Sequence, residues 1–131
     1  PYVGDISADG RSVQAARAVL GINDEALLCY GTQLQTSEEP YGWTFLNVQI
    51  SSSDNVERLQ QEMKQLGCLL IAVTDNLGYV SFEYCVDGTE NSDGSTTLMV
   101  TEADADAMAG QSVKAMSQTP AGLQKLVELI K

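Results

Sequence analysis

The chain contains no histidine, and only 7 of its 131 residues are lysine or arginine. Without an imidazole, Ser-His-Asp and Cys-His catalysis are excluded, and so are most transition-metal sites. Eighteen aspartates and glutamates give a net charge of -11, which repels phosphate and makes nucleic acid and anionic membranes poor partners. We interpret the acidic surface as one that keeps the protein soluble; the alternative is that it attracts a cationic partner.

Long hydrophobic runs are also missing. No stretch of 18 apolar residues occurs, so no segment is predicted to span a membrane, and no signal peptide is visible. The chain begins at Pro1 rather than at a methionine, and we expect it to be a trimmed fragment of a longer protein. Its length and an apolar fraction of 44% predict that residues 1–131 form a single domain with one core.

The three cysteines, Cys29, Cys68 and Cys85, are not at metal-ligand spacing, and an odd number is not a disulfide framework. We expect core thiols; the alternative is a Cys29–Cys85 bridge. The acidic loop at 87–95 invites a calcium interpretation, but Val100 stands where such a loop needs a bidentate glutamate. The sequence therefore predicts no catalytic residue, no metal site and no cofactor.

Residues 54–78 carry the strongest helical periodicity, with apolar residues spaced alternately by 3 and 4 from Val56 to Leu77. Ser53 or Asp54 is the expected N-cap. We expect one continuous helix through Gly67, because the apolar stripe keeps its phase there. The alternative is a helix that ends at Gly67, followed by a strand over 68–76.

Three shorter helices are predicted on similar grounds. Residues 11–21 carry an apolar stripe that includes Val19, and they follow a candidate N-cap (Ser7 or Asp9) and end at Gly21. Residues 102–116 follow a capping box formed by Thr101 and Asp104. Residues 119–131 start with Thr119 as the N-cap and Pro120 at the first helical position.

Glu102, Asp104 and Asp106 could be interpreted as paired carboxylates for hydrolysis. Alternate residues of a helix point apart, however, so these acids are not expected to converge on one substrate. Compensation of the helix dipole explains them better.

Alternating patterns predict strands at 26–36, 42–51, 79–86 and 96–101. In the second strand Trp43 and Phe45 are expected on one side and Leu46, Val48 and Ile50 on the other, which favours a central strand. The loops between strands imply hairpins. The element order is α-β-β-α-β-β-α-α, and we predict an α+β fold with a four-stranded antiparallel sheet and helices packed on one face.

The stretch "EEPYGW" (38–43) contains the chain's one tryptophan beside two carboxylates. Proline and glycine favour a hairpin loop here. Exposed aromatic rings beside acids could hold a peptide or a sugar, which makes Tyr41, Trp43, Glu38 and Glu39 the candidate ligand-binding residues. The alternative is that Trp43 packs in the core and Tyr41 covers a sheet edge.

Three segments, "YVGD" (2–5), "LQTSEEPYGWT" (34–44) and "AVTDNLGYVSFEY" (72–84), resemble a family of uncharacterised domains from Gram-positive bacteria. Its members are found in lipoproteins and in extracytoplasmic parts of membrane proteins, some of which resemble β-lactam-sensing antirepressor peptidases. The chain departs from the family pattern at "ISADG" (6–10) and at Val73-Thr74. The resemblance implies an exported, membrane-tethered domain and supplies no catalytic residue.

The leading hypothesis is a non-enzymatic extracytoplasmic binding or sensory module, attached to the membrane through a segment outside this sequence. Its partner would be a protein, a peptide or a glycan. One alternative is a structural or regulatory domain that docks on its own parent protein. Another is a carboxylate-dependent hydrolase, which needs two acids close together in a cleft.

Overall fold

The computed structural model describes residues 6–23, 31–50, 55–86 and 96–131. Its elements are α1 (Ile6–Leu20), β1 (Gly31–Gln35), β2 (Tyr41–Ile50), α2 (Val56–Val73), β3 (Leu77–Val86), β4 (Thr96–Thr101), α3 (Glu102–Ala109), α4 (Val113–Met116) and α5 (Pro120–Ile130). The α+β class is confirmed. The predicted order holds as far as α3, and the structure then has one helix more than expected, the short α4.

The described strands form one mixed sheet in the order β1-β2-β3-β4. The two hairpins, β1–β2 and β3–β4, are antiparallel as predicted. The central pair is parallel, with Tyr41 beside Leu77 and Ile50 beside Val86, so the prediction of an all-antiparallel sheet was wrong. The physical reason is α2, which carries the chain back along the sheet to the end where β2 began, as in other helical crossovers.

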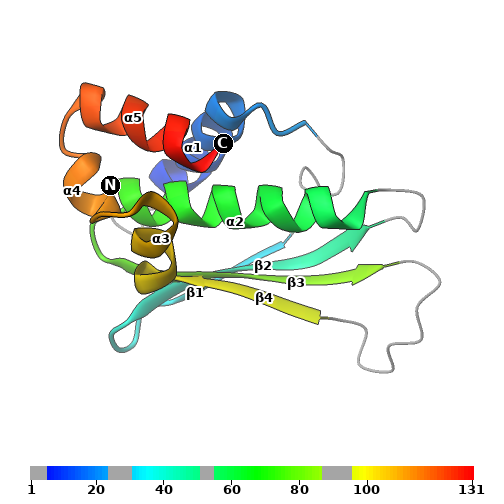
Figure 1. Ribbon diagram of the computed structural model, residues 1–131. Coiled ribbons are helices and arrows are strands. Elements are labelled where there is room, and N and C mark those ends of the chain that lie inside the picture. The colour runs from blue at the N-terminus through cyan, green and yellow to red at the C-terminus, as the bar shows by residue number, and fades with distance from the viewer. Residues whose placement is uncertain (1–5, 24–30, 51–54, 87–95) are drawn as a thin grey trace.

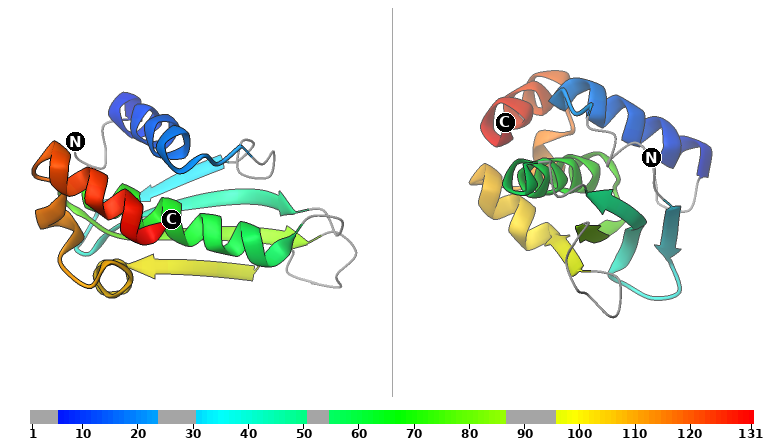
Figure 2. Two further views of the ribbon diagram at one scale, coloured as in Figure 1. Left: turned by 45° about the horizontal axis from the view of Figure 1, so that its top comes forward. Right: turned by 90° about the vertical axis from the view of Figure 1, so that its right-hand side faces the viewer.

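The helices lie in layers on one face of the sheet, as predicted. Figure 1 shows α2 running along that face, with α1 and α5 on the side of α2 away from the strands. The right-hand view of Figure 2 shows the same three layers end on, and no described helix covers the opposite face of the sheet. That face is partly polar: the hydroxyls of Thr44 and Ser81 lie 2.8 Å apart across β2 and β3.

Helix α2 is continuous through Gly67, which confirms the preferred prediction and excludes a strand from residue 68. A Cβ atom at Gly67 would lie 3.1 Å from Cγ2 of Val100, so the glycine lets the helix approach the sheet closely. The helix is shorter than predicted. It ends at Val73, and Leu77 belongs to β3, because three residues suffice to turn the chain into the next strand.

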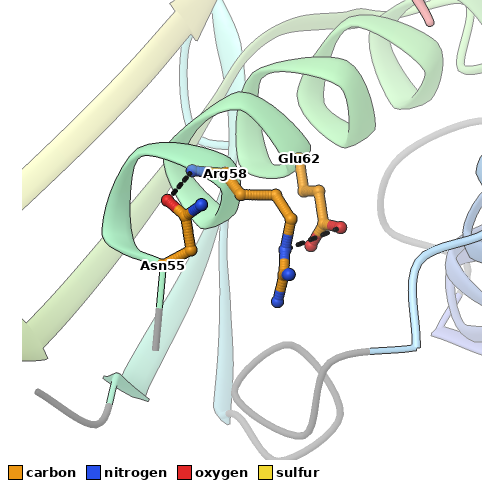
Figure 3. Close-up of polar contacts among 3 residues, drawn as sticks. All are labelled: Asn55, Arg58 and Glu62. Atoms are coloured by element: carbon orange, nitrogen blue, oxygen red, sulfur yellow. Dashed lines mark hydrogen bonds and ion pairs between the residues drawn. The ribbon is translucent and has the colours of Figure 1, made fainter. Parts of the chain in front are cut away.

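The N-cap of α2 is Asn55, not Ser53 or Asp54. Its Oδ1 accepts a hydrogen bond of 3.0 Å from the backbone N–H of Arg58, and the Arg58 guanidinium reaches the Glu62 carboxylate one turn later at 4.0 Å (Figure 3). An amide side chain satisfies a free N–H of the first turn as well as a carboxylate or hydroxyl does.

The core lies between the sheet and α2. The Trp43 and Phe45 rings stack at 5.3 Å and those of Phe45 and Phe82 at 4.9 Å. Val48 and Ile50 are buried with them, whereas the alternation had placed these two on the other side. The β2–β3 register shifts between Phe45 and Val48, and such a bulge reverses which residues face the core. The predicted central position of this strand is confirmed.

The other helices follow the predictions in part. Helix α1 begins at Ile6, so Ser7 and Asp9 lie inside it rather than at its cap, while Gly21 ends it with a φ of 71°. The predicted helix 102–116 breaks at Gly110, where φ is 77°, into α3 and α4. A positive φ is incompatible with a continuing helix. The Thr101–Asp104 capping box and the Thr119 cap are confirmed.

Some expectations concern residues outside the described ranges. These are the calcium interpretation of 87–95, the first part of the strand at 26–36, and Cys29. Cys68 and Cys85 are free thiols, Cys68 buried and Cys85 half-buried. The prediction of a core thiol is thus confirmed for Cys68.

Candidate functional site

The hairpin between β1 and β2 is organised by one glutamine. The Gln35 amide donates to the carbonyl oxygens of Glu38 and Pro40 at 2.9 and 3.1 Å. Its Oε1 accepts from the backbone N–H groups of Ser37 and Glu38 at 2.8 and 3.3 Å. The side chain therefore supplies the partners that the turn's own backbone lacks, and it fixes the backbone that precedes Tyr41.

The four predicted site residues are placed differently. Trp43 is 2% exposed, and no described residue offers a hydrogen-bond partner to its buried indole Nε1, so its ring serves the core rather than an open surface. Glu38 is exposed on the turn. Glu39 and half-buried Tyr41 line a cleft. The structure thus brings two of the four together.

We call this feature the acidic cleft. It has a volume of about 410 Å³ and lies where the β1–β2 turn meets the α2–β3 turn, the start of α3 and α4; its lining residues are Glu39, Pro40, Tyr41, Asp75, Asn76, Leu77, Gly78, Glu102 and Lys114. The parallel pairing of β2 and β3 places Tyr41 beside Leu77. Segments that are far apart in the sequence therefore meet at one end of the sheet.

Gly78 allows the two turns to meet. A Cβ atom at this position would lie 2.6 Å from Cβ of Pro40 and 3.4 Å from the carbonyl oxygen of Tyr41. Any larger side chain would push the β1–β2 turn away from β3. The floor of the acidic cleft thus depends on a residue without a side chain.

Among the described residues that line the acidic cleft, Lys114 is the one cation. Its ammonium donates hydrogen bonds of 2.8 Å to the carbonyl oxygens of Ile71, Thr74 and Leu77. Burial lowers the pKa of Lys114, and the carboxylates of Glu102, Asp75 and Asp106 act in the opposite direction. All three ammonium protons are used at the end of α2, which needs partners for its last carbonyl groups.

The three acids at the start of α3 separate as predicted. The Asp104 carboxylate accepts from the backbone N–H of Thr101 at 3.0 Å, and that of Asp106 accepts from the N–H of Val113 at 2.9 Å. Glu102 lines the acidic cleft. Two of these acids therefore cap backbone N–H groups, and of the three only Glu102 lines the acidic cleft.

Cys68 of α2 is a buried thiol. Burial, with a smaller contribution from Asp106, raises the pKa of its thiol from 9.0 to about 12. Its Sγ lies 3.9 Å from the carbonyl oxygen of Ala105. A neutral, fully covered thiol is an inert core residue.

Sequence reasoning missed Asp75, Glu102 and Lys114 as site residues. These residues meet because β2 and β3 are joined by a parallel crossover, which the sequence pattern had not predicted. If β2 and β3 ran antiparallel, Tyr41 and Leu77 would lie at opposite ends of the sheet. Among the described residues no group of three or more acids and cysteines has the arrangement of a metal site. Within the same ranges, none of the helices combines the length and apolar character that crossing a bilayer requires.

Comparison with known proteins gives no match: no family model, no curated protein and no solved structure is similar to this chain. The resemblance to extracytoplasmic domains of Gram-positive bacteria therefore remains a prediction from the three segments that carry it.

Proposed function

We propose that the chain is a non-enzymatic binding module that takes a cationic group of its partner, such as a lysine or arginine side chain of a peptide or protein, into the acidic cleft. The main observation in support is that Glu39, Asp75 and Glu102 line the acidic cleft together with Tyr41. Carboxylates next to an aromatic ring provide both the charge and the π-face that a cation prefers.

The charge of the acidic cleft supports this proposal. The one lysine in it directs all three protons into backbone carbonyl groups, so hydrogen bonds to the carboxylates are left for another donor. Lys114 still contributes a positive charge, and three acids against one lysine leave the lining with a net charge of -2. The chain as a whole carries -11, and such a field attracts cationic partners over distances of about a Debye length.

The proposal extends to the setting of the module. We place it outside the cytoplasm, attached to a membrane through a lipid or a spanning segment that is not among these 131 residues. The support is the resemblance of "YVGD", "LQTSEEPYGWT" and "AVTDNLGYVSFEY" to domains of that kind. A sensory role follows if occupation of the acidic cleft is passed to the rest of a longer protein.

The test is a titration of the isotope-labelled chain with trilysine, followed by backbone NMR. Amide signals of Tyr41, Asn76 and Gly78 are expected to shift together and to saturate. The double variant Glu39→Gln, Asp75→Asn should bind about twofold to thirtyfold more weakly, because each exposed ion pair contributes about 0.2–1 kcal/mol.

Glu128→Gln is the matched control, since it removes an exposed acid that lies outside the acidic cleft. It should change the affinity less than twofold. If Glu128→Gln weakens binding as much as Glu39→Gln or Asp75→Asn does by itself, the peptide responds only to net charge and the proposal fails. Shifts spread over all acidic surfaces would lead to the same conclusion.

A further inference from the structure

The outer edge of β4 forms one margin of the sheet. No described strand pairs with it, and Figure 1 shows α3 following directly at its end. The strand contains no charged residue, proline or glycine, and it pairs with β3 in an unbroken register. Charges, prolines and bulges are the features that commonly keep an edge strand from pairing with another chain. Since β4 has none of them, its edge is open to an added strand.

One hydrogen bond shows which backbone groups of β4 point outward. The N–H of Thr101 donates to the Asp104 carboxylate at 3.0 Å, so it does not point toward Tyr79, its partner in β3. In an antiparallel pair, residues alternate between bonding the neighbouring strand and pointing away from it. Met99 and Thr97 therefore share the outward orientation of Thr101. No turn or loop of the described residues supplies a partner for their N–H and C=O groups.

The side chains along this edge are accessible as well. Thr97 is exposed, and Met99 is 52% exposed. Val19 and Leu129, the other large apolar residues exposed in the described ranges, lie on helices; the periodicity had assigned Val19 to the core stripe. Met99 is thus the one large apolar group exposed on a described strand, where a residue of an added strand can pack against it.

The open edge ends at two carboxylates. Asp104 accepts the outward N–H of Thr101, which places its carboxylate on the outer side of β4. Glu102, in the same first turn of α3, lines the acidic cleft. That turn therefore connects the β4 edge with the acidic cleft, and a strand added about 4.8 Å from β4 would end beside it.

Charge restricts the occupant of the edge. A second copy of this chain would bring a net charge of -11 against the same charge, which opposes that association. A segment with a lysine or arginine at its end would instead place a cation beside Asp104 and Glu102, where the carboxylates can accept hydrogen bonds from it.

We infer that the partner of the acidic cleft is an extended segment that adds a strand to the outer edge of β4. Its lysine or arginine lies at the end of that strand, beside Asp104 and Glu102. This inference rests on the proposed function and names the conformation of the partner. Antiparallel pairing is slightly more stable per residue than parallel pairing, so we expect the cation at the N-terminal end of the segment. Backbone hydrogen bonds supply affinity, and the acids supply specificity.

The test is a titration of the isotope-labelled chain with the end-blocked peptide Lys-Thr-Val-Thr-Val-Thr, observed by amide hydrogen exchange. In the free protein, the N–H groups of Leu98 and Val100 should exchange slowly because they pair with β3, and those of Thr97 and Met99 rapidly. At saturation, exchange at Thr97 and Met99 should slow at least tenfold. Unchanged exchange at these two residues would overturn the inference.

Three control peptides examine the contacts separately. Two of them carry N-methyl groups, one on both valines and the other on the last two threonines. Only alternate N–H groups of an added strand face β4, so one of these two should bind at least tenfold more weakly than the other. In the third, norleucine replaces lysine, and binding should weaken at least threefold. Equal binding by the two methylated peptides, or no loss with norleucine, would contradict the inference.

Two variants of Met99 test the same edge from the side of the protein. Met99→Pro removes an outward N–H without removing a bond to β3 and should weaken peptide binding at least tenfold. Met99→Thr keeps the N–H and should weaken it less than threefold. The methylated peptides probe this contact on the unmodified chain, should Met99→Pro fail to fold. Equal binding by the two variants would count against an added strand.

Trilysine separates this inference from the proposed function. If trilysine binds at Tyr41, Asn76 and Gly78 but the longer peptide leaves Thr97 and Met99 unprotected, the acidic cleft is retained and the β4 edge is excluded. If trilysine does not bind, the proposed function fails and this inference fails with it. Protection of Thr97 and Met99 that rises with protein concentration alone would also overturn the inference, because the edge would then hold a second copy.

Discussion

The ammonium nitrogen of Lys114 lies 2.8 Å from the carbonyl oxygen of Ile71, so a side chain of α4 caps the last turn of α2. Helix α2 has no basic residue of its own in that turn. The hydroxyl of Ser117, the residue at which α4 ends, donates a hydrogen bond of 2.5 Å to the carbonyl oxygen of Ala72. The short α4 is thus the C-terminal cap of a helix some forty residues earlier in the chain.

Lys114→Met should lower the free energy of unfolding by about 2–4 kcal/mol, because it removes three hydrogen bonds from a charged donor and leaves carbonyl groups at the helix end without partners. Urea denaturation of the two proteins measures the difference. Lys125→Met removes an exposed lysine from α5 and should cost less than about 0.5 kcal/mol. Equal stability of the two variants would show that the Lys114 cap contributes nothing.

Substitutions at Tyr41 and Trp43 should separate binding from folding. Trp43→Ala removes a buried, stacked ring and should cost about 3–5 kcal/mol of stability. Tyr41→Ala should cost about 1 kcal/mol and weaken trilysine binding at least threefold, because the ring is a wall of the acidic cleft.

Urea denaturation and the NMR titration measure these two quantities. Trp43→Phe is the control for the core: it keeps a ring and removes the Nε1 that no described residue pairs with, so it should cost much less than the alanine variant. A Trp43→Ala protein as stable as the unmodified chain would contradict the assignment of this ring to the core.

Cys68 should make the protein less stable in alkali. Its thiol has a pKa of 9.0 when exposed and about 12 in the fold. Below pH 9 the neutral thiol is present in both states. Above pH 9 the unfolded chain loses the proton and the folded chain keeps it, so the free energy of unfolding falls as the pH rises toward 12.

At pH 10.5 this loss is about 2 kcal/mol, since one pKa unit corresponds to about 1.4 kcal/mol. The loss caused by Cys68 is measured by denaturing the unmodified chain and the Cys68→Ala variant at pH 7 and at pH 10.5, both with reductant. The other titrating groups are common to the two proteins, so their effects cancel. Cys85→Ala, at a half-buried thiol, is the comparison. A pH dependence that is the same with and without Cys68 would disprove the prediction.

The sequence predicted those features that local chemistry determines. The periodicity from Val56 onward located α2, the alternation located β3, and Thr101 and Thr119 marked the starts of their helices. Each of these signals acts within a few residues.

The errors concern relations between distant segments. Nothing local to residues 41–50 indicates whether β3 will run parallel to β2, because that direction is decided by the return of α2 along the sheet. The bulge between Phe45 and Val48 likewise reversed a face that strict alternation had assigned. The acidic cleft depends on that crossover, so the sequence indicated Glu39 and Tyr41 without their neighbours Asp75 and Glu102.

The parallel pairing of Tyr41–Ile50 with Leu77–Val86 also affects how the protein can come apart. Each hairpin pairs strands that are adjacent in the chain, while the central pair is joined only through the long connection that contains α2. If α2 detaches, the sheet separates along its middle into two hairpins. Each half then exposes one long, apolar strand edge, and two copies opened in this way could join through those edges into aggregates.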